Sequence, residues 1–91
     1  MSNWYLYIIR CSDGTLYTGI STDVDRRFTQ HQSEGYAGSR YLKGRGPLSL
    51  VFKAKLGSRS LALKVEHRVK RMAKARKEKL INGSGNFEEG S

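Results

Sequence analysis

WYLYIIRCSDGTLYTGI, residues 4–20, is the stretch from which the fold of this chain can be predicted. Two runs rich in apolar and aromatic side chains, residues 3–10 and 15–20, flank an Asp-Gly pair, which is a strong signal for a hairpin turn. The first run also shows the two-residue alternation of a strand, with Trp4, Leu6 and Ile8 opposed to Tyr5, Tyr7 and Ile9. We therefore predict two antiparallel strands, with Tyr7 and Tyr17 on neighbouring strands.

A helix is predicted directly after the second strand, in the segment STDVDRRFTQHQSEG. Thr22 is the expected N-cap, and Asp25, three residues later, has the position of a capping-box acid. Gly35 is a typical stop signal. One face of this helix would carry four residues at helical spacing, which are Val24, Arg27, Phe28 and His31.

The second half of the chain predicts one more strand and a long helical region. Residues 35–47 are rich in Gly and basic residues and indicate a loop, whereas residues 48–54, LSLVFKA, indicate a third strand. GSRS at 57–60 supplies a turn and candidate helix caps. Residues 61–81 have the strongest helical pattern, as one helix or as two, with an apolar stripe of Leu61, Val65, Val69 and Met72.

The order of these elements indicates an α/β fold in a single domain. Strand, strand, helix, strand, helix is the order of a small sandwich, in which a three-stranded antiparallel sheet is flanked by helices. A chain of 91 residues has room for one such domain, which we assign to residues 1–83, with residues 84–91 as a flexible C-terminal tail. The single cysteine, Cys11, cannot form an internal disulfide and is most simply a small buried residue.

Charge is the clearest signal in the composition. The chain has 17 Lys and Arg against 8 Asp and Glu, a net charge of +9 and a pI near 10.1. Such a balance favours a polyanionic partner, with nucleic acid first and an anionic membrane surface second. No apolar stretch approaches the roughly 20 residues of a membrane helix, and no targeting segment is recognisable. We expect a cytoplasmic protein that binds nucleic acid and has no membrane segment.

The tyrosines of the hairpin have two interpretations. They can be amphipathic residues with the ring packed inward and the hydroxyl in water, or the hydroxyls of Tyr7 and Tyr17 can converge on a cleft at the sheet surface. A phenol with a pKa of about 10 is a poor base at neutral pH, so catalysis would need a nearby cation or metal. Arg27 can be a solvated charge or a phosphate ligand, and His31, one turn later, could join the same site.

Glu66 is one of only two acidic residues between positions 59 and 81, among nine Lys and Arg. An i,i+4 pair with Lys70 is the simple explanation. At the margin of the apolar stripe, the carboxylate could instead hold one Mg²⁺, with water and phosphate oxygens completing the shell. The basic residues are either a solvated face or a surface for phosphates; the candidates are Lys70, Arg71 and Lys74 in the helical region and Arg40, Lys43 and Arg45 in the loop.

Together these motifs resemble the GIY-YIG nuclease family, and especially its small stand-alone bacterial (YhbQ-like) members. The matching features are LY at 6–7, YTG at 17–19, Arg27 eight residues past the glycine, and a lone Glu on a later helix. The resemblance extends over residues 3–87. It departs from the family name at Tyr5, where the motif has Gly, and at the central Thr of the second motif.

The resemblance implies metal-dependent hydrolysis of phosphodiester bonds in nucleic acid, in DNA rather than RNA, in DNA repair or processing. Glu66 would bind a single divalent cation, Mg²⁺ or Mn²⁺. Tyr7 or Tyr17 would deprotonate or orient the attacking water, with His31 tuning the tyrosine or contacting phosphate. Arg27 would neutralise charge that develops in the transition state. Asn82 is a further candidate by its placement near the C-terminus, because some family active sites include an Asn there.

Two other functions stay open from the sequence. The chain could be a catalytically silent basic module that binds DNA or RNA, because the presence of the expected side chains does not establish turnover. An amphipathic helix that docks on an anionic membrane is the weakest alternative, since the basic face lacks large exposed aromatic residues. The oligomeric state, monomer or weak dimer, cannot be predicted.

Overall fold

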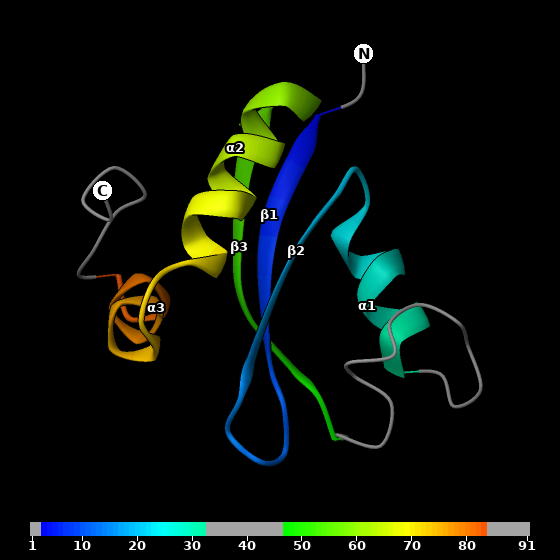
Figure 1. Ribbon diagram of the computed structural model, residues 1–91. Coiled ribbons are helices and arrows are strands. Elements are labelled where there is room, and N and C mark those ends of the chain that lie inside the picture. The colour runs from blue at the N-terminus through cyan, green and yellow to red at the C-terminus, as the bar shows by residue number, and fades with distance from the viewer. Residues whose placement is uncertain (1–2, 33–46, 84–91) are drawn as a thin grey trace.

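Six helices and strands make up the part of the chain described by the computed structural model, residues 3–32 and 47–83 (Figure 1). In chain order they are β1 (Trp4–Arg10), β2 (Leu16–Ser21), α1 (Val24–Gln32), β3 (Ser49–Gly57), α2 (Arg59–Lys70) and α3 (Lys74–Ile81). Except for Pro47, the predicted loop of residues 35–47 lies outside the described residues, as does the predicted tail. The division into residues 1–83 and 84–91 therefore stays a prediction.

The sheet has three antiparallel strands in the order β2-β1-β3, so β1 is central. The hairpin between β1 and β2 forms where the Asp-Gly pair predicts it. The Cys11 amide donates to the Thr15 carbonyl at 2.9 Å, and Gly14 has φ +85°, a conformation that glycine adopts without strain. In this register Tyr7 lies opposite Gly19 on β2 and Lys53 on β3.

Helices cover both faces of the sheet, with α1 on one side and α2 and α3 on the other (Figure 1). The alternation of β1 divides the core accordingly. Tyr7 and Ile9 pack with Val24 of α1, whereas Leu6 and Ile8 pack with residues of α2 and α3 such as Val65, Val69 and Leu80. The predicted α/β sandwich is thus confirmed, and Cys11 is buried and free in the layer of α1.

The N-cap of α1 is Asp23, so the prediction of Thr22 is wrong by one residue. The Asp23 carboxylate accepts from the Arg26 amide at 3.1 Å, and the Asp23 amide in turn donates to Ser21 Oγ at 3.0 Å. A side chain that accepts from the amide three residues later satisfies one of the free donors of the first turn. The predicted spacing within the helix holds, because Val24 and His31 are buried and Phe28 packs beside them.

The long helical region consists of two helices. Ser58 caps α2 by accepting from the Leu61 amide at 3.1 Å, as the GSRS segment predicts, and the helix ends at Lys70, with three residues between it and α3. Leu61 does not belong to the apolar stripe, because it is 44% exposed and Ala62 is buried in its place. Among the described residues, no helix is long and apolar enough to cross a membrane.

Candidate active site

Tyr7 is the centre of the candidate site. It lies in the middle of β1 on the face that α1 covers, and only 1% of it is exposed. Gly19 is its partner on β2, and a Cβ at that position would lie 2.4 Å from Tyr7 Oη and 2.6 Å from Cζ. The phenol therefore rests directly on the backbone of Gly19, in space that any larger residue would fill.

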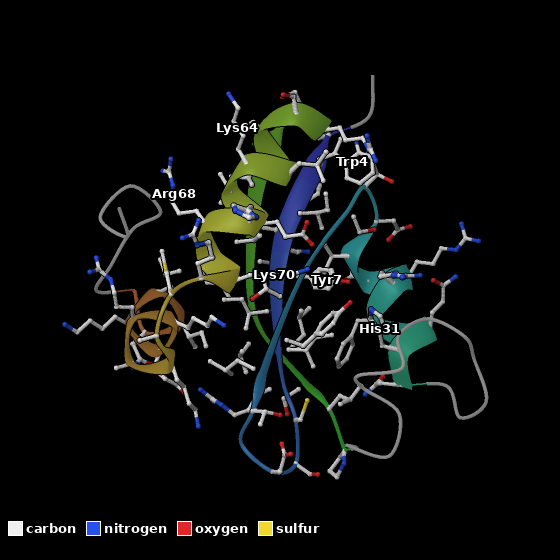
Figure 2. The ribbon with its side chains drawn as sticks, in the orientation of Figure 1. Trp4, Tyr7, His31, Lys64, Arg68 and Lys70 are labelled. Atoms are coloured by element: carbon white, nitrogen blue, oxygen red, sulfur yellow. The ribbon has the colours of Figure 1, made fainter. Side chains whose placement is uncertain are left out.

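His31 holds the hydroxyl of Tyr7. The two residues form a buried hydrogen bond of 3.1 Å between Tyr7 Oη and His31 Nε2, and the side chains approach each other between the sheet and α1 (Figure 2). Tyr17 completes the group, with its ring centroid 6.5 Å from that of Tyr7 and 5.5 Å from that of His31. These three side chains, predicted as site residues from the sequence, lie together.

Arg27 also lies beside Tyr7. It is half-buried one turn before His31, and its Nη1 lies 3.4 Å from Gln30 Oε1. Its side-chain hydrogen bond with Tyr7 and its positive charge both favour the ionised phenol. The guanidinium thus adds a cation to the aromatic group, which is the neighbour that a reactive tyrosine requires.

Glu66 approaches the same phenol from the opposite layer. Its carboxylate is near enough for its charge to act on Tyr7, although Tyr7 faces α1 and Glu66 belongs to α2. Helix α2 packs on β1 and on the edge strand β2, which allows a side chain at the helix margin to reach past the sheet. The Glu66 side chain is 19% exposed, and Lys70 Nζ lies 3.4 Å from its Oε2, so the simple i,i+4 pair is present as well.

The protonation states of the pair Tyr7 and His31 follow from burial. Burial raises the pKa of Tyr7 to about 12, Tyr17 and Glu66 add to the rise, and Arg27 opposes it. Burial and the charge of Arg27 lower the pKa of His31. At neutral pH the phenol is therefore protonated and the imidazole neutral, so Tyr7 Oη donates and His31 Nε2 accepts in their hydrogen bond. Within the described residues, His31 Nδ1 is buried without a hydrogen-bond partner.

The remaining predicted site residues lie at different places. Lys70 is paired with Glu66, and Arg71 is exposed at the C-cap of α2. Lys74 lies near the turn between β1 and β2, with its Nζ 3.6 Å from the point where a Cβ on Gly14 would stand. Asn82 is exposed at the C-cap of α3, in the layer opposite α1, and the structure does not bring it to Tyr7. Arg40, Lys43 and Arg45 lie outside the described residues.

Sequence reasoning missed the structural role of Gly19 and the position of Lys77. A glycine inside a strand is a signal for close approach of another group, and Tyr7 is that group. Lys77 on α3 is partly buried, and burial together with the charge of Lys70 lowers its pKa. Lys77 is thus a cation close to Lys70. No signal in the sequence distinguishes it from the other basic residues of α2 and α3.

Tyr5, which stands where the family motif has Gly, lies two residues before Tyr7 on β1. It is half-buried, and Lys53 Nζ lies 5.9 Å from its ring centroid and 3.8 Å from Asp25 Oδ1. These residues line a pocket of about 180 Å³ at the start of α1, with Thr22, Asp23 and Val24. The larger residue at this position is therefore accommodated in this pocket, and Tyr7 keeps its place against Gly19.

The surroundings of His31 predict that the protein loses stability as the pH falls below neutrality. Its pKa is held below the ordinary value of 6.5, so the unfolded chain takes up a proton first as the pH decreases. The free energy of unfolding should therefore decrease between pH 7.5 and 5.5, by at most about 1.4 kcal/mol per pH unit from this one group. Urea denaturation across that range measures the slope.

The variant His31→Gln should flatten this dependence, because it retains a polar side chain and removes the titration. His67→Gln is the matched control, since His67 is exposed on α2 and should leave the slope unchanged. An equal slope in the wild type and in His31→Gln would contradict the prediction.

Comparisons with known proteins identify the family of the chain. Residues 3–79 match the family described as GIY-YIG catalytic domain. The chain is 53% identical over 85 residues to a UPF0213 protein of Enterobacter sp. (strain 638), covering 93% of this chain and 81% of that protein. It is 52% identical over 89 residues to the UPF0213 protein YhbQ of Escherichia coli (strain K12), covering 98% of this chain and 87% of that protein.

Two solution NMR structures are similar to the fold. The UPF0213 protein BH0048 from Bacillus halodurans has a TM-score of 0.57 at 40% identity, over 97% of this chain and 92% of that one. The protein EF2693 from E. faecalis has a TM-score of 0.64 at 31% identity, over 91% of this chain and 86% of that one. With a family match over most of its length and relatives of this similarity, the chain belongs to the GIY-YIG catalytic domain family.

Proposed function

We propose that this protein is a metal-dependent endonuclease that hydrolyses phosphodiester bonds in nucleic acid. One observation carries the proposal: the buried hydroxyl of Tyr7, bonded to His31, is acted on by the guanidinium of Arg27 and the carboxylate of Glu66. A phenol, a cation and a carboxylate are brought into one neighbourhood here from three different elements, β1, α1 and α2. They are the groups that a phosphodiesterase needs around the scissile phosphate.

The pair Tyr7 and His31 can take up the proton of the attacking water. A phenol with a pKa of about 12 is almost fully protonated at neutral pH, so it can accept a proton only while it releases its own. Neutral His31 is a suitable acceptor 3.1 Å away, in the tautomer that leaves Nε2 free. Tyr17 is more exposed than Tyr7 and orients the water or the phosphate in this proposal.

Arg27 stabilises the negative charge that develops on the phosphate oxygens. A guanidinium offers several donors in a fixed plane, which suits two oxygens of one phosphate. Its half-buried position beside Tyr7 strengthens this interaction, because fewer water molecules screen the charge.

Glu66 is the residue that would hold the divalent cation. The described residues contain no group of three or more His, Cys, Asp and Glu that could enclose a metal ion. A single carboxylate fits Mg²⁺ or Mn²⁺, which are often bound through one or two carboxylates, with water and substrate phosphate supplying the other oxygens. When bound, the ion lowers the pKa of a water molecule and polarises the phosphate. The donor set therefore fits one ion, whose other oxygen ligands would come from water and, in the complex, from substrate phosphate.

Nucleic acid is the substrate class that the charge supports. The net charge is +9, and Lys70, Arg71 and Lys74 are exposed at the end of α2, at its C-cap and at the start of α3. DNA is proposed before RNA, in repair or processing, as the family resemblance implies. A catalytically silent DNA- or RNA-binding module is the alternative, and the test below separates the two.

Labelled DNA and RNA duplexes, flaps, nicks and single strands incubated with Mg²⁺ or Mn²⁺ test the proposal. The wild type should cut at least one of them, and EDTA should abolish cutting. Arg27→Ala should lower the rate by about 10²–10³, the usual loss for one donor to a developing oxyanion. Arg26→Ala removes an exposed charge from the same helix and is the matched control, with little effect expected. A wild type that binds these substrates and cuts none would favour the silent module.

A further inference from the structure

The carboxylate of Glu66 already has a cationic partner. Lys70 Nζ lies 3.4 Å from Glu66 Oε2, one helical turn later. The Glu66 side chain is 19% exposed and that of Lys70 is 53% exposed, so a shielded carboxylate is neutralised by a side chain that largely remains in water. A long, exposed lysine can leave such a pair at little cost, because ion pairs of this kind contribute little to stability.

This same carboxylate is the one that the proposed function assigns to the divalent cation, and the inference rests on that function. An ammonium and a divalent cation on one carboxylate repel each other, and only one of them can neutralise it fully. We propose that Lys70 occupies the cation position at Glu66 in the metal-free protein and competes there with Mg²⁺ or Mn²⁺. The lysine keeps the half-buried carboxylate paired until the metal arrives.

A phosphate of nucleic acid is a second group that the ammonium of Lys70 can bind. Lys77 on α3 is close enough for the charge of Lys70 to act on it, so Lys70 has both a carboxylate and another cation in its neighbourhood. A backbone phosphate of nucleic acid placed there would meet two lysines and would draw Lys70 away from Glu66. Phosphate binding then exposes the carboxylate to the metal, and each ligand raises the affinity for the other.

Binding of Mn²⁺ to the full chain, followed by water proton relaxation in the absence of nucleic acid, tests this competition. Lys70→Met should lower the dissociation constant of Mn²⁺ roughly twofold, the change expected when an exposed i,i+4 partner no longer competes for the carboxylate. Lys70→Arg keeps the charge and the pairing, so its Mn²⁺ affinity should stay near that of the wild type. Lys64→Met is matched for net charge and changes an exposed residue that points away from the sheet (Figure 2), so it too should resemble the wild type.

The variant Glu66→Gln separates the failure of this inference from that of the proposed function. If Glu66→Gln loses Mn²⁺ binding and Lys70→Met does not change it, the competition is overturned and the metal site stands. If Mn²⁺ binding does not depend on Glu66, the metal site of the proposed function is overturned and the competition with it. Equal gains in Lys70→Met and Lys64→Met would show only a general effect of net charge and would also overturn the competition.

Discussion

Replacement of Glu66 by Gln is expected to lower metal-dependent cleavage about 10³-fold while nucleic-acid binding persists, because metal-ion stabilisation of transition-state charge is worth several kcal/mol. Gln has nearly the same shape and keeps the helix, but its neutral amide is a poor ligand for a hard divalent cation. Binding should remain at least as strong as in the wild type, since one negative charge is removed from a basic surface. Single-turnover cleavage and fluorescence anisotropy on the same substrate measure the two effects.

Glu78→Gln is the matched control for this variant. Glu78 is the other acidic residue of the basic region, lies on α3 and forms an ion pair with Arg10 of β1. The substitution makes the same change in net charge within the same layer and should leave the cleavage rate close to that of the wild type. Cleavage by Glu66→Gln at the wild-type rate, or a similar loss of cleavage in Glu66→Gln and Glu78→Gln, would contradict the proposed role of Glu66 as the metal ligand.

The second large effect is expected for Gly19→Ala. Its methyl group would lie 2.4 Å from Tyr7 Oη and 2.6 Å from Cζ, so the phenol or the edge strand must shift. Overpacking of a filled core costs about 1–3 kcal/mol of folding free energy. Displacement of a catalytic group by about 1 Å can lower the rate roughly 10²-fold. Thermal unfolding and single-turnover cleavage measure the two losses, and the loss in rate should persist at temperatures where the variant is fully folded.

Thr18→Val provides the control for Gly19→Ala in the same strand. Thr18 is 3% exposed, and its hydroxyl is without a hydrogen-bond partner among the described residues. Valine preserves its shape and removes an unsatisfied polar group, so stability should be unchanged or higher. If Gly19→Ala is as active as Thr18→Val, the contact between Tyr7 and residue 19 does not position the hydroxyl.

Local patterns in the sequence predicted the elements on the tyrosine side of the site, and the family resemblance named its residues. Strand alternation separates Tyr7 and Ile9 from Leu6 and Ile8, which the two core layers confirm, and helical spacing predicts that Arg27 and His31 share a face. Each relation depends only on the geometry of one element, or of two elements joined by a short turn. For the same reason the errors are small, with Asp23 as the N-cap in place of Thr22.

The approach of Glu66 to Tyr7 could not be derived from such patterns. The two residues belong to opposite layers, and the Glu66 charge acts on Tyr7 because α2 packs on the edge strand β2 as well as on β1. The break between α2 and α3 was also open, since no Gly or Pro marks residues 71–73. The family resemblance named Glu66, and the structure supplies the spatial relation that the resemblance left implicit. For Asn82, the resemblance suggested a residue that the structure keeps in the layer away from Tyr7.

The proposed function depends on one divalent cation, bound by Glu66 of α2, that acts on a substrate beside Tyr7 although α2 and Tyr7 lie on opposite faces of the sheet. Paramagnetic broadening of backbone amide signals by substoichiometric Mn²⁺ tests this most directly. We predict that the signals of Gly19 and Glu66 broaden together at the lowest Mn²⁺ concentration, and that Glu66→Gln abolishes the effect on both. Broadening centred instead on Asp23 and Asp25, with the signals of Gly19 and Glu66 unaffected, would contradict the account.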